Sequence, residues 1–147
     1  MITDLKNELS NAKQLTENGA VGYRTTGKEL LDLNFMTSSL RNKSEDEIFD
    51  SFLRAFYEDK MLAIKWLFFM RDAREGMGER RSFRIILNGL GHRHPTIAKE
   101  LISLVPEYGR YDDLFSLMDN DEMTKIVVNF IHQQFKEDYM NYKNKKP

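Results

Sequence analysis

Apolar residues recur every three or four positions along most of this chain, and short polar corners marked by glycine or proline separate the resulting segments. That spacing places apolar side chains on one face of a helix. No segment shows the sustained alternation of apolar and polar residues, rich in β-branched side chains, that indicates a half-buried strand. The pattern therefore predicts an all-α fold.

Capping and helix-breaking residues predict where the helices begin and end. Ser44 and Glu47 form a capping box ahead of an apolar run, which predicts a helix at 45–58. Gly91 and Pro106 are predicted to end two later helices, and Asp112 or its neighbour is predicted to cap a short one. The predicted helices are 3–18, 30–36, 45–58, 61–72, 82–90, 96–105, a short helix from 112, and 121–143.

The predicted helices favour a stacked arrangement. Segment 61–72 is apolar on nearly all sides, which is typical of a helix buried between neighbours, and Trp66 is its largest side chain. Helices of about 10 to 14 residues joined by short corners indicate antiparallel pairs stacked in a row, as in a segment of a HEAT-like helical-repeat solenoid. Such arrays need protected ends, so the helix at 121–143 is predicted to cap the array or to bind a partner.

Composition excludes several classes of protein. The 147 residues are enough for one core, and 41% hydrophobic with 31% charged residues is ordinary globular composition. The chain has no cysteine and three histidines, which removes thiolate chemistry and leaves little material for a zinc site. It also lacks a run of about 18 apolar residues. We therefore expect a cytoplasmic protein without a membrane segment, metal or cofactor.

Basic residues are concentrated in the middle of the chain. The formal net charge is only -1, which argues against a general nucleic-acid binder. Positions 60–111, however, contain ten lysines or arginines against five acids, a local charge of +5. If the protein has a basic face, this middle third supplies it.

Two polar corners interrupt the helical pattern within that region. Residues 71–80 read R-D-A-R-E-G-M-G-E-R, and residues 105–114 read V-P-E-Y-G-R-Y-D-D-L. Guanidinium groups can bind two phosphate oxygens at once, and aromatic rings can stack on unpaired bases. The candidate RNA-binding residues are Arg74, Arg80, Arg81, Arg84, Arg93, Arg110, Tyr108 and Tyr111.

A structural role is the alternative for the same corners. The combined motifs contain six acids and four arginines, so Arg71 and Asp72 could tie the first corner to acids of the second. Both a binding role and a structural role stay open for the arginines that outnumber their local acids, which are Arg74, Arg80, Arg81 and Arg84. The glycines are predicted to make turns with positive φ. The candidate structural residues are Arg71, Asp72, Gly76, Gly78, Glu107, Asp112 and Asp113.

The two corners, with His94-Pro95 between them, resemble the signature of the TROVE module of the Ro 60-kDa ribonucleoprotein and of a related uncharacterised family of bacteria, phages and plants. Upstream, T-G-K-E-L-L-D-L-N-F at 26–35 is similar to the start of that module. The resemblance covers about residues 22–118. Tyr111 stands where the family usually has tryptophan, and the D-x-S-x-S motif of the domain that normally follows is missing, so the chain is expected to be an N-terminal portion.

The resemblance implies a ring or arc of HEAT-like repeats that binds RNA, with single strands entering the ring and small structured RNAs on its basic outer surface. The resemblance places the module at 22–118. The peripheral N-terminal helix with the glycine-rich linker at 1–21 and the long C-terminal helix at 119–147, both predicted from the residue pattern, lie outside it. The predicted function is that of a non-enzymatic RNA-binding module that contacts phosphates. The alternative is a scaffold that self-assembles or docks a partner protein, which would be a host protein if the chain comes from a phage.

Overall fold

The computed structural model describes residues 26–72, 77–108 and 111–145, and in this part of the chain it contains helices and no strand. The all-α prediction is confirmed. The predicted helix at 3–18, the linker that follows it, Arg74, Gly76 and Arg110 lie outside the described residues. The helices are α2 (Gly27–Ser38), α3 (Glu45–Glu58), α4 (Lys60–Asp72), α5 (Met77–Arg93), α6 (Pro95–Tyr108), α7 (Asp113–Ser116) and α8 (Asp121–Lys145).

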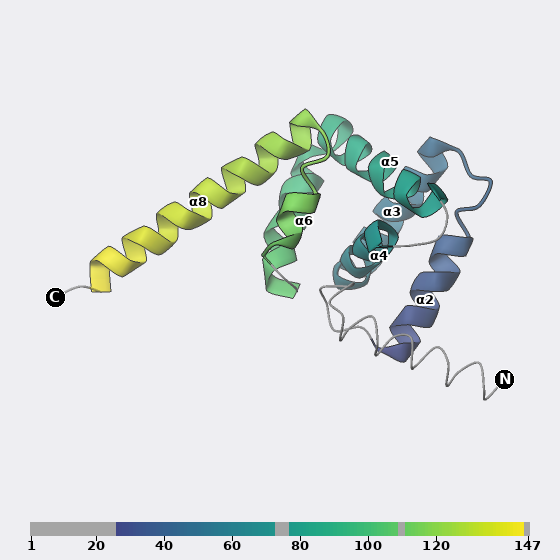
Figure 1. The fold of residues 1–147 in the computed structure, drawn as a ribbon, viewed down its shortest axis with the longest axis horizontal. Coiled ribbons are helices and arrows are strands. Elements are labelled where there is room, and N and C mark those ends of the chain that lie inside the picture. The colour runs from purple at the N-terminus through teal and green to yellow at the C-terminus, as the bar shows by residue number, and fades with distance from the viewer. Residues whose placement is uncertain (1–25, 73–76, 109–110, 146–147) are drawn as a thin grey trace.

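From α3 onward, each long helix packs against the next long helix along the chain, and α2 packs against α4. Contacts join α3 to α4, α4 to α5, α5 to α6 and α6 to α8, and α5 also contacts α3 and α8. Helix α2 lies at one end of the described molecule in Figure 1, and α8 extends from the other. This sequential packing is the stacked arrangement that the helix lengths predicted.

Helix α4 supplies the centre of the core. It contacts α2, α3, α5 and α6, and Trp66 is 2% exposed, in agreement with the apolar pattern of this segment. Aromatic side chains of α3 pack around it, with the Phe52 ring centroid 6.3 Å from that of Trp66. The largest fully buried side chains are Trp66, Phe49, Phe52, Phe56, Phe68, Leu33, Ile64, Leu67, Met70, Ile86 and Leu87.

Capping boxes begin α2 and α3. The predicted box of Ser44 and Glu47 is present, because each side chain accepts a hydrogen bond from the other residue's backbone N–H. Thr26 and Glu29 form a second box at α2, which the sequence analysis did not identify although the spacing is the same. Helix α2 therefore starts earlier than predicted.

Three predictions about helix-breaking residues were wrong. Gly91 lies inside α5, where a Cβ atom would come within 3.2 Å of Met123 Cγ, so glycine here allows close approach of α8. Pro106 lies inside α6 because, near the end of the helix, proline costs a single ladder hydrogen bond. Gly78 is helical in α5 rather than a turn residue with positive φ, since the helix already begins at Met77.

Helix α8 has a packed half and an exposed half. The Asn120 side chain caps it, accepting a hydrogen bond from the Met123 backbone N–H at 2.9 Å. Met123 and Val127 are buried against the body, whereas every residue from 135 to 145 is exposed. Figure 1 shows this second half extending away from the other helices. None of the described helices is both long and apolar enough to cross a membrane.

Candidate nucleic-acid interface

An open groove of about 810 Å³ lies between the start of α3 and the exposed face of α5. Helix α5 is amphipathic: Ile86 and Leu87 are fully buried in the core, while the residues that face the groove are mostly exposed. This follows from helical spacing, since positions four apart share one face. The lining residues are Glu45, Asp46, Arg80, Arg81, Arg84, Ile85, Asn88, Gly89, His92 and Arg93.

Two acids of α3 pair with two arginines of α5 across the groove. Arg81 Nη2 lies 3.5 Å from Glu45 Oε1, and Arg93 Nη1 lies 3.4 Å from Asp46 Oδ1. Both pairs are largely exposed, so each contributes about 0 to 1 kcal/mol at most to stability. Arg93 also stacks on the Phe49 ring, with its guanidinium carbon 4.7 Å from the ring centroid. That contact anchors the end of α5 on α3.

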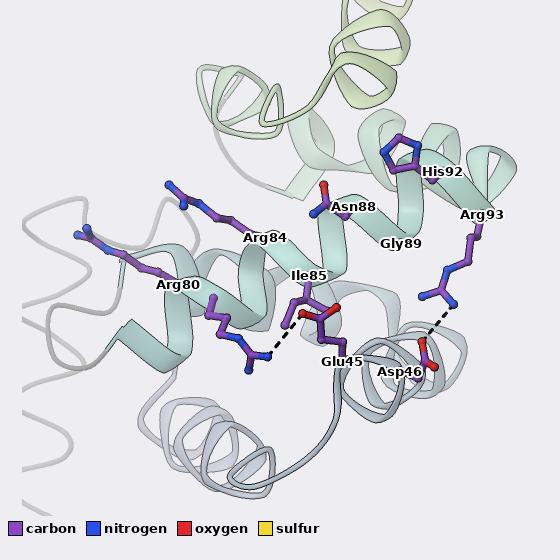
Figure 2. Close-up of a pocket in the computed structure, with 10 residues that line it drawn as sticks. Glu45, Asp46, Arg80, Arg84, Ile85, Asn88, Gly89, His92 and Arg93 are labelled. Carbon is purple, nitrogen blue, oxygen red and sulfur yellow. Dashed lines mark hydrogen bonds and ion pairs between the residues drawn. The ribbon is translucent and has the colours of Figure 1, made fainter.

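Arg80 and Arg84 are less engaged. Arg84 Nε lies 4.0 Å from Asp119 Oδ1, at the outer limit for an ion pair, and its side chain is 73% exposed. Among the described residues, no acid pairs with Arg80. Figure 2 shows both side chains extending from the same side of α5. They stand one helical turn apart, about 6 Å along the axis.

The charge of the groove is positive. Four arginines face two carboxylates, so the lining has a formal charge of +2 with His92 neutral. Among the described lining residues, none is Phe, Tyr or Trp, and the imidazole of His92 is the one aromatic ring. Guanidinium groups can therefore hold phosphates here, whereas stacking on a base would depend on the imidazole of His92.

The predicted contact between Arg71 and an acid of the second corner is present, and it lies outside the groove. Arg71 forms a two-bond pair with Asp72, from Nε to Oδ1 at 2.8 Å and from Nη2 to Oδ2 at 3.0 Å. Its Nη1 donates to Asp113 Oδ1 at 3.0 Å and to Ser116 Oγ at 2.9 Å. The guanidinium also stacks on Phe68 at 4.6 Å. Four hydrogen bonds and the contact with the Phe68 ring hold the guanidinium in place, which makes this a structural clamp.

Electrostatics reinforce that clamp. Burial alone would lower the pKa of Arg71, but its hydrogen bonds and charge interactions with Asp72 and Asp113 outweigh burial and raise the pKa. Asp113 is buried, and its Oδ2 atom has no hydrogen-bond partner among the described residues. Asp113 therefore depends on Arg71 for compensation of its charge.

The remaining candidates do not join either cluster. Glu107 and Asp112 are exposed and neither pairs with Arg71, and Asp112 has helical backbone angles and makes no capping hydrogen bond. The predicted Asp112 cap is thus absent, because capping needs an extended conformation at that position. Tyr108 is half-buried against the core and Tyr111 is exposed, and neither lines the groove.

Sequence reasoning missed the acidic side of the groove. Glu45 lies 36 residues before Arg81 and Asp46 lies 47 residues before Arg93, so only the packing of α3 on α5 brings each pair together. Asn88 was also missed, and it accepts a hydrogen bond from Asn120, the residue that caps α8, at 3.2 Å. Within the described ranges, no group of three or more His, Cys, Asp or Glu side chains is placed to hold a metal ion.

Comparison with known proteins gives two matches. A family model described as "Domain of unknown function (DUF2828)" matches residues 16–144. The chain is also similar to "Uncharacterized protein L728" of Acanthamoeba polyphaga mimivirus, at 31% identity over 106 residues, which are 71% of this chain and 18% of the viral protein. The chain thus spans less than a fifth of that relative. No solved structure matches. The resemblance to the TROVE module is not tested by these matches and stays a prediction.

Proposed function

The chain belongs to the family described as domain of unknown function DUF2828, and on that premise we propose that it is a non-enzymatic RNA-binding helical-repeat module. In this proposal the groove between α3 and α5 holds RNA by its phosphates. Arg80 and Arg84 make the first contacts, and Arg81 and Arg93 extend them.

One observation supports the proposal above others: four arginines line a single groove, and two of them extend without a close acid among the described residues. An exposed ion pair contributes only about 0 to 1 kcal/mol, and a guanidinium makes the same kind of charge-assisted hydrogen bond to phosphate as to carboxylate. A phosphate can therefore replace a carboxylate as the partner of an arginine in this groove.

The lining also indicates what kind of recognition to expect. Phosphate contacts position a nucleic acid without reading its sequence, and base contacts supply specificity. Since Tyr108 and Tyr111 do not line the groove, we expect binding with little sequence preference. The choice of RNA over other phosphate polymers rests on the resemblance of the two corners to the TROVE signature.

A fluorescence-anisotropy titration with a short labelled single-stranded RNA tests the proposal. The triple variant R80A/R81A/R84A is compared with K125A/K136A/K143A, which removes the same charge from α8. We expect the groove variant to lose roughly tenfold or more in affinity and the α8 variant to lose much less. Equal losses in the two variants, or no binding by the wild-type chain at low salt, would overturn the proposal.

A second candidate function, self-association, is supported by the exposed half of α8. Phe135 and Tyr139 are 73% and 57% exposed, and they continue the apolar series of Ile131 along one flank of the helix. Exposed aromatics in a row are typical of an interface. We infer that this flank pairs with a second copy of the chain.

Sedimentation equilibrium tests self-association. The wild-type chain should show a concentration-dependent dimer, and F135A/Y139A should remain monomeric with unchanged helix content. A wild-type chain that stays monomeric at the highest usable concentration would rule this candidate out.

A further inference from the structure

Glu45 and Asp46 place their carboxylates beside two of the four arginines that line the groove. Both belong to the first turn of α3, where the helix dipole favours negative charge. Each places one carboxylate oxygen near a guanidinium nitrogen of α5, at 3.5 Å for Arg81 and 3.4 Å for Arg93. Figure 2 shows Asp46 joined to Arg93 across the groove. The protein thus supplies its own anions to two of the four arginines.

The four arginines are consequently not equivalent. Arg81 and Arg93 have carboxylate partners within 3.5 Å, whereas Arg84 has one only at 4.0 Å and Arg80 has none among the described residues. An incoming anion can contact Arg80 and Arg84 without breaking a close ion pair. To use Arg81 and Arg93 it must displace Glu45 and Asp46.

We propose that Glu45 and Asp46 are internal competitors for the groove, so that the groove selects a chain of linked phosphates over an isolated phosphate ion. The inference rests on the proposed RNA-binding function and deepens it, because it states which class of anion the groove accepts. The competitors are exposed side chains on a helix end, so they can move aside without unpacking the core.

Multivalency is the physical basis of this selection. An isolated phosphate that contacts Arg80 or Arg84 gains one or two charge-assisted hydrogen bonds. It has no linked second phosphate that could displace Glu45 or Asp46 from their arginines. In a polymer, a phosphate held at Arg84 keeps the next phosphate at a high effective concentration beside Arg81, where it outcompetes Glu45. Because each exposed pair is weak, a polymer can displace both acids.

The test neutralises the competitors and compares them with acids on the same helix. The variant E45Q/D46N removes both, whereas D50N/E58Q removes the same charge from two exposed α3 residues that do not line the groove. Labelled single-stranded RNA and inorganic polyphosphate serve as polymer probes, and inorganic phosphate serves as a competitor at constant ionic strength. Circular dichroism and thermal unfolding confirm that all variants are folded.

We expect E45Q/D46N to bind both polymers roughly three- to tenfold more tightly than the wild type, since two competing pairs in the middle of the usual range for exposed pairs amount together to a little under one decade of affinity. D50N/E58Q should change affinity by less than about twofold, because screening weakens charges outside the groove. Inorganic phosphate should compete poorly against RNA on the wild type and no better on E45Q/D46N, because a phosphate at Arg80 or Arg84 displaces neither acid whereas the polymer displaces both.

The outcomes separate this inference from the function on which it rests. Binding of polyphosphate but not RNA, with tighter binding by E45Q/D46N, would overturn the RNA function and support the competitor role. RNA binding that E45Q/D46N leaves unchanged or weakens, or that D50N/E58Q strengthens equally, would overturn the competitor role alone. Failure of every variant to bind either polymer would overturn both.

Discussion

Arg71 and Asp113 lie 42 residues apart in the chain and form a partly buried ion pair of 3.0 Å between Nη1 and Oδ1. The pair connects the end of α4 to the start of α7 and thus joins the two polar corners of the sequence. The Arg71 guanidinium is committed to Asp72, Asp113 and Ser116 at once. These motif residues therefore stabilise the fold, and the groove on α5 carries the proposed binding.

Arg71→Ala should destabilise the protein by about 3 kcal/mol, because removing one partner leaves the buried Asp113 uncompensated. Arg71→Lys should lose less, since it keeps the charge and loses the forked contacts. Urea unfolding followed by circular dichroism measures both. Arg54→Ala removes an exposed arginine of α3 and is the control. If Arg71→Ala costs no more than Arg54→Ala, the clamp is not a stabilising feature.

Glu29→Gln should destabilise the protein more than Glu47→Gln does. Both residues close a capping box, but only Glu29 also accepts a hydrogen bond from Lys65, which is 5% exposed, at 2.7 Å. Glutamine can still close the box, so the Glu29 variant loses mainly the partner of a buried charge, at a cost of about 2 kcal/mol. Equal unfolding midpoints for the two variants would contradict this assignment.

The same residue predicts a pH dependence. Burial alone would raise the pKa of Glu29, but hydrogen bonds from Lys65 and Thr26 and the charge of Lys65 lower it below its usual 4.5. A lowered pKa in the folded state means that the contribution to stability is present above pH 4.5 and is lost as the pH falls through the folded-state value. Wild-type stability should thus fall more steeply below pH 4.5 than that of Glu29→Gln. If the wild type and Glu29→Gln lose stability in parallel as the pH falls, the prediction is contradicted.

Gly89→Ala should destabilise the packing beneath the groove. A Cβ atom at Gly89 would lie 2.5 Å from the Phe49 ring. Alanine gains about 1 kcal/mol in helix propensity, and overpacking costs about 1 to 3 kcal/mol, so the net effect should be a loss. In a double-mutant cycle, Phe49→Leu should reduce the loss. A thermally stabilised Gly89→Ala protein would show that α3 and α5 are less closely packed.

Arg93→Ala and Arg80→Ala should separate stability from binding. Arg93 stacks on Phe49 and pairs with Asp46, so its loss should cost about 1 kcal/mol of stability. Arg80 is exposed and has no acid partner among the described residues, so Arg80→Ala should leave the unfolding midpoint unchanged and weaken RNA binding. Thermal unfolding and anisotropy, measured on the same samples, check both. A destabilised Arg80→Ala protein would assign Arg80 a structural role.

Helix positions could be predicted because periodicity and capping are local. The spacing of Ser44 and Glu47 predicted the start of α3, and the same spacing of Thr26 and Glu29 could have predicted the start of α2. The helix ends predicted at Gly91 and Pro106 were wrong, because the surrounding fold, and not the local preference of the residue, determines where these helices end. Glycine usually disfavours a helix, but Gly91 lies inside α5, and its lack of a side chain allows the start of α8 to pack closely against it.

The groove could be predicted only in part. The spacing of the arginines in the sequence places them on one face of α5, so that side of the groove could be predicted. Their partners Glu45 and Asp46 come from another helix, and that pairing depends on how α3 packs on α5. Tyr108 and Tyr111 were grouped with the arginines because they are near in a motif, yet the end of α6 does not contribute to the groove lining.

The salt dependence of RNA binding tests the central claim most directly. For single strands, the logarithm of the affinity falls with the logarithm of salt concentration by about 0.7 for each phosphate contact. Three or four arginine contacts therefore predict a wild-type slope of about -2 to -3, and R80A/R81A/R84A should reduce its magnitude to below about 1. A slope that the triple variant leaves unchanged, or no measurable salt dependence in the wild type, would contradict phosphate binding in this groove.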